Sequence, residues 1–86
     1  MKILGKQVVA ARGLLGWTQG QLASAADVAI DTVVSWERGE HHPRESTVRR
    51  VVEVIEARGV EFTNGGAPGV RFKPKPEAAE NESAGK

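Results

Sequence analysis

Hydrophobic residues in the first part of the chain recur at helical spacing, beginning with residues 7–15. Val8, Ala11 and Leu15 fall on one side of a helix there, with Leu14 at the border of that side. A glycine follows at once and is expected to end the helix. The pattern therefore predicts a first helix whose inner side packs into a core.

Gly13 lies inside this predicted helix. Glycine destabilises a helix interior by ~1 kcal/mol relative to alanine, so its presence needs a physical reason. We expect Gly13 to pack closely against a neighbouring element.

Two short helices joined by a tight turn are predicted within residues 18–39. Thr18 and Gln21 have the T-x-x-Q spacing of a capping box, in which each side chain satisfies a free backbone donor at the start of a helix. Asp27 stands where the chain must turn, and aspartate tolerates left-handed backbone angles. The second helix runs from about Ala29 to Arg38 and stops at the following glycine, a typical position for a left-handed C-terminal cap.

The second of these helices has two sides of different character. Val33, Trp36 and Glu37 share the inner side at a spacing of about 3.6 residues per turn. The outer side carries Ile30, Asp31, Val34, Ser35 and Arg38. Two helices of this length cannot bury both of their faces alone, so we expect other elements to surround them.

A last helix is predicted to start near Ser46 or Thr47 and to end at Gly59. Its apolar stripe consists of Val48, Val51, Val52 and Ile55. Valine is a poor intrinsic helix former, so packing against the rest of the protein must stabilise this helix.

Alternating apolar and polar residues then predict two strands, Val60 to Thr63 and Val70 to Lys73, around a loop rich in turn residues. Placing Glu61 opposite Arg71 brings both phenylalanines of the strands onto one face. An isolated two-stranded hairpin is marginal in water. It must therefore lean on the helices or pair its edge with another chain, and the second option would build a dimer.

These elements predict a mainly α protein with three parts. Residues 1–59 form a compact four-helix domain, and residues 60–73 form a β-hairpin that packs on it or is used for dimerisation. Residues 74–86 contain nothing larger than alanine to bury, so we expect a disordered tail.

The composition of the 86 residues allows one domain near the lower size limit for a self-sufficient core. The absence of cysteine excludes disulfides and fits a reducing compartment. Lys6, Gln7 and Arg12 interrupt the opening apolar stretch before it reaches signal or membrane length. We therefore expect a soluble cytoplasmic protein that does not contact a membrane.

The charge balance is weak for a nucleic-acid binder, with a net charge of +1 and a pI near 8.2. Up to Lys73, 10 lysines and arginines stand against 8 aspartates and glutamates. Attraction to DNA would therefore depend on where the charges lie rather than on their total.

The adjacent histidines His41 and His42 invite a metal hypothesis, but no third ligand stands at a suitable spacing. A zinc site needs at least three protein ligands, so we expect no metal and no other cofactor. The sequence also lacks a nucleophile and base at recognisable spacing and a glycine-rich phosphate loop after a strand. We do not expect an enzyme.

Four segments together resemble the lambda-repressor-like helix-turn-helix family, also called the XRE family, whose members are related to Cro and the C1 repressors. The segments are ARGLLGWTQGQLA, V-x-x-x-T-V at residues 28–33, WERGEHHP, and STVRRVVEVIEARGVEF. The resemblance covers roughly residues 3–62, and the combination is more specific than any segment alone. It implies a four-helix domain containing the helix-turn-helix, encoded by a bacterium or a phage.

The resemblance also implies a function and a structural ion pair. It implies a regulator of transcription that binds double-stranded DNA, with the helix from about Ala29 to Arg38 in the major groove. In the family, the residue matching Arg12 forms a largely buried ion pair with the residue matching Glu37. The alternative is that Arg12 and Glu37 are unrelated surface charges.

The resemblance assigns candidate DNA contacts of two kinds. Contacts to the backbone would come from Thr18, Gln19, Thr32, Arg38, His42 and Arg44. Base reading would come from Ile30, Asp31, Val34 and Ser35, with Thr32 also near a base edge. Ile30 and Val34 could contact thymine methyl groups, and Asp31 could accept a hydrogen bond from cytosine N4.

Each assignment has a structural alternative. Gln19 could simply be a good helix former in a first turn, and the loop carrying His42 and Arg44 could be a solvated polar loop. Asp31 could only favour the positive end of the helix dipole. The family usually has Gln, Arg, Asn or Ser at the early recognition positions, and usually Ser or Thr at the helix cap, where this chain has Ala29, Ile30 and Asp31.

Two kinds of partner besides DNA follow from this interpretation. A single small domain presents one helix to one groove, so the DNA-binding hypothesis implies a homodimer. The competing hypothesis is a protein-binding adaptor or antitoxin-like module that uses exposed Ile30 and Val34 as an apolar contact. The weak net charge and the aliphatic outer side favour this alternative somewhat.

Overall fold

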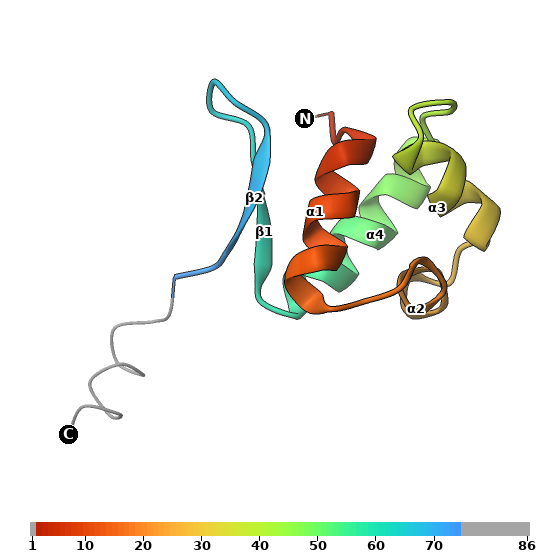
Figure 1. The fold of residues 1–86 in the computed structure, drawn as a ribbon, viewed down its shortest axis with the longest axis horizontal. Helices are drawn as coiled ribbons and strands as arrows, with labels where there is room; N and C mark the ends of the chain where they lie inside the picture. The colour runs from red at the N-terminus through yellow and green to blue at the C-terminus, as the bar shows by residue number, and fades with distance from the viewer. Residues whose placement is uncertain (1, 75–86) are drawn as a thin grey trace.

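The computed structural model describes residues 2–74, which form four helices followed by a two-stranded hairpin (Figure 1). The elements are α1 (Gly5–Leu15), α2 (Gln19–Ala26), α3 (Ile30–Glu37), α4 (Glu45–Ala57), β1 (Val60–Thr63) and β2 (Gly69–Phe72). The prediction of a mainly α fold with a C-terminal hairpin is confirmed. The disordered tail expected at residues 74–86 lies outside the described residues from position 75 onward.

The ends of the central helices follow from capping residues. At the start of α2, the Gln21 backbone N–H donates to Thr18 Oγ1 at 3.0 Å, and the Thr18 N–H donates to Gln21 Oε1 at 2.8 Å. Asp27 ends this helix in a left-handed conformation with φ 58°, and Gly39 follows α3 with φ 78°. The capping box and both turns are therefore as predicted.

α1 begins two residues before its predicted start, at Gly5, because a polar side chain caps it. The Leu4 backbone N–H donates to Gln7 Oε1 at 2.8 Å. The same side chain then reaches the hairpin, where Gln7 Nε2 donates to the Thr63 oxygen at 3.2 Å and to the Gly69 oxygen at 3.0 Å. Gln7 is 3% exposed, and the sequence pattern did not indicate this central position.

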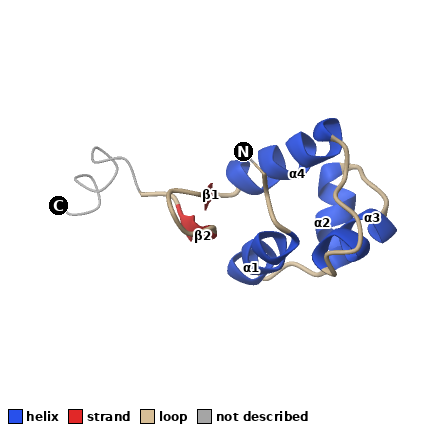
Figure 2. Cartoon of the chain, turned by 90° about the horizontal axis from the view of Figure 1, so that it is seen from above, coloured by secondary structure: helices blue, strands red, loops and turns tan. Residues whose placement is uncertain are grey.

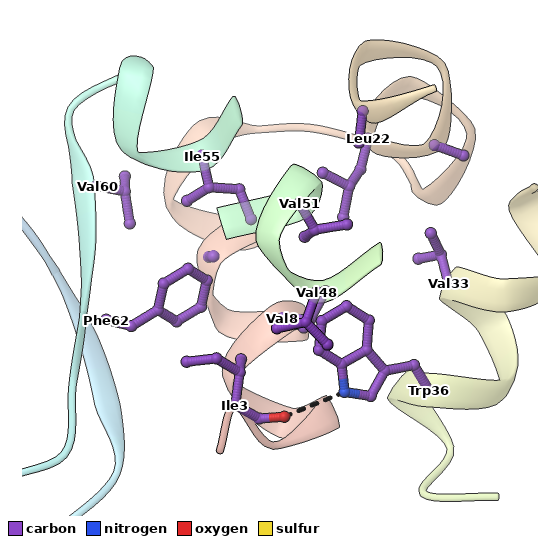
Figure 3. Packing of buried hydrophobic residues seen from close by; sticks show 13 residues of the cluster. Ile3, Val8, Leu22, Val33, Trp36, Val48, Val51, Ile55, Val60 and Phe62 are labelled. Carbon is purple, nitrogen blue, oxygen red and sulfur yellow. Dashed lines mark hydrogen bonds between the residues drawn. The ribbon is translucent and has the colours of Figure 1, made fainter. Parts of the chain in front are cut away.

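The core lies between the helices and the inner face of the hairpin (Figure 3). Its largest fully buried side chains are Trp36, Ile3, Leu22, Ile55, Val8, Val33, Val51 and Val60. The indole of Trp36 is buried without losing its hydrogen bond, because Nε1 donates to the Ile3 oxygen at 3.1 Å. Packing of α4 through Val51 and Ile55 explains how a valine-rich segment remains helical.

The hairpin has the predicted register, with Glu61 opposite Arg71 and Phe62 opposite Val70. It leans on the helices: β1 contacts α1 and α4, and β2 contacts α1 (Figure 2). Phe62 is buried, whereas Phe72 on the same face is 57% exposed. The hairpin thus gains its stability from the helices, and part of its apolar face remains uncovered.

The structure decides one open position of α1 and contradicts one expectation for this helix. Leu14, at the border of the inner stripe, is exposed and lies outside the stripe. A Cβ built on Gly13 would meet nothing within 4 Å, so Gly13 does not pack closely against a neighbour. The close approach occurs at Gly5 instead, where a Cβ would lie 2.0 Å from the backbone oxygen of Trp36.

We expect opposite effects from alanine at these two glycines. Gly13→Ala should raise the free energy of unfolding by about 0.5 to 1 kcal/mol, because it adds helix propensity in open space. Gly5→Ala should lower it by about 2 kcal/mol or more, because α1 and α3 must separate to admit the methyl group. Urea unfolding of both variants measures the two effects, and a loss of stability in Gly13→Ala would contradict this description of α1.

Candidate nucleic-acid interface

The helices α2 and α3 of the candidate interface meet at the turn formed by Asp27. The Val28 backbone N–H donates to the Ala23 oxygen at 3.0 Å, which closes the end of α2. α3 then packs against α2 and α1 through Val33 and Trp36, both buried. The opposite side of α3 faces solvent, and Ile30 on it is 48% exposed.

An ion pair between Arg12 of α1 and Glu37 at the end of α3 connects these helices. Arg12 Nε lies 2.7 Å from Glu37 Oε2, and Arg12 Nη2 lies 2.9 Å from Glu37 Oε1. Arg12 Nη1 also donates to the Trp17 oxygen at 2.9 Å, just before α2. The side chains are 18% and 5% exposed, so the two charges lie largely out of water. The structure therefore contains the bidentate pair that the resemblance implies.

The charge state of Arg12 follows from this arrangement. The hydrogen bonds that Arg12 donates to Glu37 raise the pKa of Arg12 above its ordinary value, against the opposing effect of burial. Arginine is protonated throughout the usual pH range, and the raised pKa moves its titration further from that range. Arg12 is thus a permanent positive charge beneath the start of α2.

Gln19, the first residue of α2, joins the same network. Its Nε2 donates to Glu37 Oε1 at 2.9 Å, so Glu37 receives hydrogen bonds from two helices. This hydrogen bond orients the Gln19 side chain at the N-terminus of α2. A residue that served only as a good helix former would not need such a bond. The side chain beside it, Thr18, already accepts the capping hydrogen bond described above.

The outer side of α3 lies next to the start of α2. A Cβ on Gly20 would lie 3.7 Å from Ile30 Cδ1, so the Ile30 side chain reaches over the first turn of α2. Asp31 is exposed in the first turn of α3, where the cap residue Ala29 supplies no side-chain hydrogen bond. A carboxylate there is favoured by the helix dipole. The structure is therefore compatible with the alternative that Asp31 only stabilises the start of α3.

The remaining α3 residues of the candidate set are only partly accessible. Val34, Ser35 and Thr32 are each half-buried. Ser35 Oγ is 3.5 Å from the Thr32 oxygen, a long and therefore weak hydrogen bond within the helix. The hydroxyl of Ser35 thus remains able to turn toward a partner.

The loop after α3 places charged and polar side chains near the C-terminal end of that helix. The ring of His42 packs edge-on against Trp36, with centroids 5.9 Å apart and planes at 86°. Arg38 is exposed at the end of α3, and Arg44 is exposed at the residue before α4. His42 therefore contacts the core through Trp36 while the residue itself remains exposed in the loop.

Two lysines that the sequence analysis did not select lie in the same region. Lys6 lines a hollow together with Arg38 and Glu37, and Lys2 lines a second hollow with His41 and His42. The close approach of Gly5 to Trp36 brings these N-terminal lysines beside α3. No spacing rule within the sequence could indicate this, because the lysines and Arg38 are more than thirty positions apart.

Within residues 2–74, no three His, Cys, Asp or Glu side chains gather as metal ligands would. None of the helices in that range is both long and apolar enough to span a membrane.

Comparison with known families gave one match. The model of a family described as helix-turn-helix matches residues 8–62, which is more than half of the 86 residues. The matched range contains the α2 and α3 pair and most of α1, and it extends through α4 into β1. No curated protein matches the chain.

The buried ion pair leads to a test of stability. Glu37→Gln should lower the free energy of unfolding by about 3 kcal/mol, because it leaves the charge of Arg12 largely buried without a counter-charge. Glu61→Gln is the matched control, since it breaks the exposed pair with Arg71 and should cost less than about 1 kcal/mol. Chemical denaturation measures both, and equal losses would contradict the structural importance of the Arg12–Glu37 pair.

Proposed function

The chain belongs to the helix-turn-helix family of Cro/C1 type, and we propose that it is a sequence-specific regulator that inserts α3 into the major groove of double-stranded DNA. The observation that carries the proposal is the exposed outer side of α3 beside an α2 N-terminus whose first side chain is fixed by Glu37. A major groove admits an α-helix, and a helix N-terminus presents free N–H groups to a phosphate.

The backbone contacts in this proposal surround α3. Thr18 and Gln19 lie at the start of α2, and the free N–H groups of that first turn would face a phosphate. Arg38, His42 and Arg44 lie beyond the other end of α3, with Thr32 on the helix itself. Lys2 and Lys6 extend this second group, since they line hollows with Arg38 and His42.

Base reading is assigned to Ile30, Asp31, Val34 and Ser35. Ile30 is the most exposed apolar side chain of α3 and would meet a thymine methyl group. Asp31 would accept from cytosine N4, and it would repel phosphates wherever the sequence offers no such donor. A carboxylate at this position therefore favours selectivity over general affinity for DNA.

We propose that the active form is a homodimer in the cytoplasm of a bacterium or in a cell infected by a phage. One α3 reads only a few base pairs, and two copies would read half-sites about 34 Å apart or a multiple of this distance. No catalytic role is proposed.

The alternative is a module that binds another protein through the same surface. Exposed Ile30 and the net charge of +1 favour it, because an apolar contact needs no positive surface. The two functions differ in their response to salt: DNA binding weakens steeply as salt rises, whereas an apolar protein contact does not.

The experiment is a selection of bound sequences from a random duplex pool, followed by a salt titration of the best duplex. The proposal expects an enriched sequence and a linear fall of log K with log salt, at a slope of about −0.9 for each phosphate contact. An absence of enrichment together with salt-independent capture of a protein would favour the alternative.

Asp31→Ala tests the base reader within the same experiment. If Asp31 reads cytosine, the variant loses preference at one position of the enriched sequence, worth about 1 to 3 kcal/mol of discrimination. If it serves only the helix end, the variant binds more tightly with the same preference. Glu53→Ala on the water-facing side of α4 is the control, because it removes the same charge away from α3.

A further inference from the structure

The loop between the two strands begins with Asn64, Gly65 and Gly66. All three residues are exposed. An asparagine followed by glycine is chemically labile, because the backbone nitrogen of the glycine can attack the carbonyl carbon of the asparagine side chain and close a five-membered ring. The loop therefore exposes a reactive pair of residues to water.

The nucleophile of this ring closure is the backbone nitrogen of Gly65, and its surroundings are open. Within residues 2–74, no backbone oxygen accepts a hydrogen bond from the Gly65 N–H. A Cβ built on Gly65 would meet nothing within 4 Å, so no neighbouring group crowds this position. The nitrogen can therefore lose its proton and meet the Asn64 side chain without breaking a backbone hydrogen bond of the fold.

A hydrogen bond on the same peptide group favours the loss of that proton. The Gly66 N–H donates to the Asn64 backbone oxygen at 2.8 Å. This oxygen and the Gly65 nitrogen belong to one peptide group, which shares the negative charge between them after deprotonation. A donor at the oxygen stabilises the charged form and makes the Gly65 N–H more acidic. The loop thus activates the nucleophile beyond what the sequence of the pair alone would do.

We propose that Asn64 is a site of spontaneous backbone modification in this chain. The Gly65 nitrogen gives its proton to hydroxide and attacks Asn64 Cγ. The bond between Cγ and the side-chain nitrogen then breaks, and that nitrogen takes a proton from water and leaves as ammonia, which regenerates the hydroxide. The product is a five-membered succinimide ring that contains the Gly65 nitrogen.

Water opens this ring in two ways. Addition to the former side-chain carbonyl carbon breaks its bond to the Gly65 nitrogen and leaves an ordinary aspartate at position 64. Addition to the backbone carbonyl carbon leaves the main chain running through the side chain, as an isoaspartate. Both routes take up one water for each ammonia lost, and both lower the net charge of the chain from +1 to 0.

Isoaspartate at position 64 disturbs an anchor of the hairpin. The Thr63 and Gly69 oxygens, on either side of the loop, both accept from Gln7 Nε2, at 3.2 Å and 3.0 Å. Isoaspartate adds a methylene group to the main chain next to Thr63, so the loop no longer matches the spacing of these two oxygens. Because Gln7 Oε1 also accepts from the first turn of α1, the modification weakens the link between the hairpin and that helix.

The test is incubation of the full chain in warm, mildly alkaline buffer, followed by ion-exchange chromatography and peptide mass mapping. We expect a more acidic species in which OH has replaced the side-chain NH2 at position 64, formed at a rate that rises with hydroxide concentration. Hydroxylamine attacks a succinimide, so it should cut the chain between residues 64 and 65. Asn81 precedes Glu82 and is the internal control. An intact Asn64, or equal conversion of the two asparagines, overturns the proposal.

Gly65→Ala is the matched variant, because its methyl group meets nothing in the fold but crowds the attacking nitrogen. It should slow the conversion several-fold while leaving the circular dichroism unchanged, and an unchanged rate overturns the proposed attack. Following the wild-type chain in urea isolates the contribution of the fold. Faster conversion in native buffer than in urea supports activation by the Gly66 N–H, and faster conversion in urea overturns that activation.

The link to α1 has its own measurement. The isoaspartate form is separated from the incubated protein, and its urea unfolding is compared with that of Asn64→Asp, which carries the same charge on an ordinary backbone. The isoaspartate form should unfold at a lower urea concentration. Equal unfolding of the two forms overturns the effect on the Gln7 anchor. None of these measurements involves DNA, so their outcome is separate from that of the proposed function.

Discussion

The carboxylate of Glu37 is the constraint on which the candidate interface depends. It accepts hydrogen bonds from Arg12 on α1 and from Gln19 on α2 while standing at the end of α3. One buried anion thus fixes the relative positions of three helices and the side chain at the start of α2. The Glu37 side chain is only 5% exposed. Removing the charge of Glu37 or of Arg12 would therefore leave the other charge largely buried without its partner. The position of α3 relative to α1 and α2 therefore depends on this buried hydrogen-bond network.

The sequence predicted well those features of the fold that depend on residues close together in the chain. The capping box at Thr18 and the turn at Asp27 depend on neighbours in the sequence, and both were predictable. The hairpin register was predictable because the pairing that sets Glu61 opposite Arg71 also places Phe62 and Val70 on the same face. The earlier start of α1 was missed because it depends on Gln7, which links the helix to the distant strand residues Thr63 and Gly69.

The candidate site was less predictable for the same reason. Lys2 and Lys6 approach α3 only because Gly5 allows the two helices to touch, a contact between segments far apart in the sequence. The presence of a glycine inside the helix also predicted close packing at Gly13, whereas the space beside it is open. The resemblance supplied the partnership of Arg12 with Glu37, which spacing alone could not give.

Exposed polar and aliphatic residues of α3 lie at one end of the molecule, and the hairpin lies at the other (Figure 1). The charge of the whole chain is nearly balanced, so the proposed affinity for DNA would depend on local positive charges such as Lys6 and Arg38, which line one hollow. In the proposed function, a small total charge would limit nonspecific capture and leave discrimination to the side chains of α3.

The most direct measurement is an NMR titration of the full chain with a duplex obtained by selection. If α3 enters the major groove, the backbone signals of Gln19, Ile30, Asp31 and Ser35 should shift with the duplex. The signals of the outer hairpin face, such as Glu61, should stay in place. If the α3 signals remain unmoved by every duplex but shift when a protein ligand is added, this surface binds protein and the proposed DNA contact is wrong.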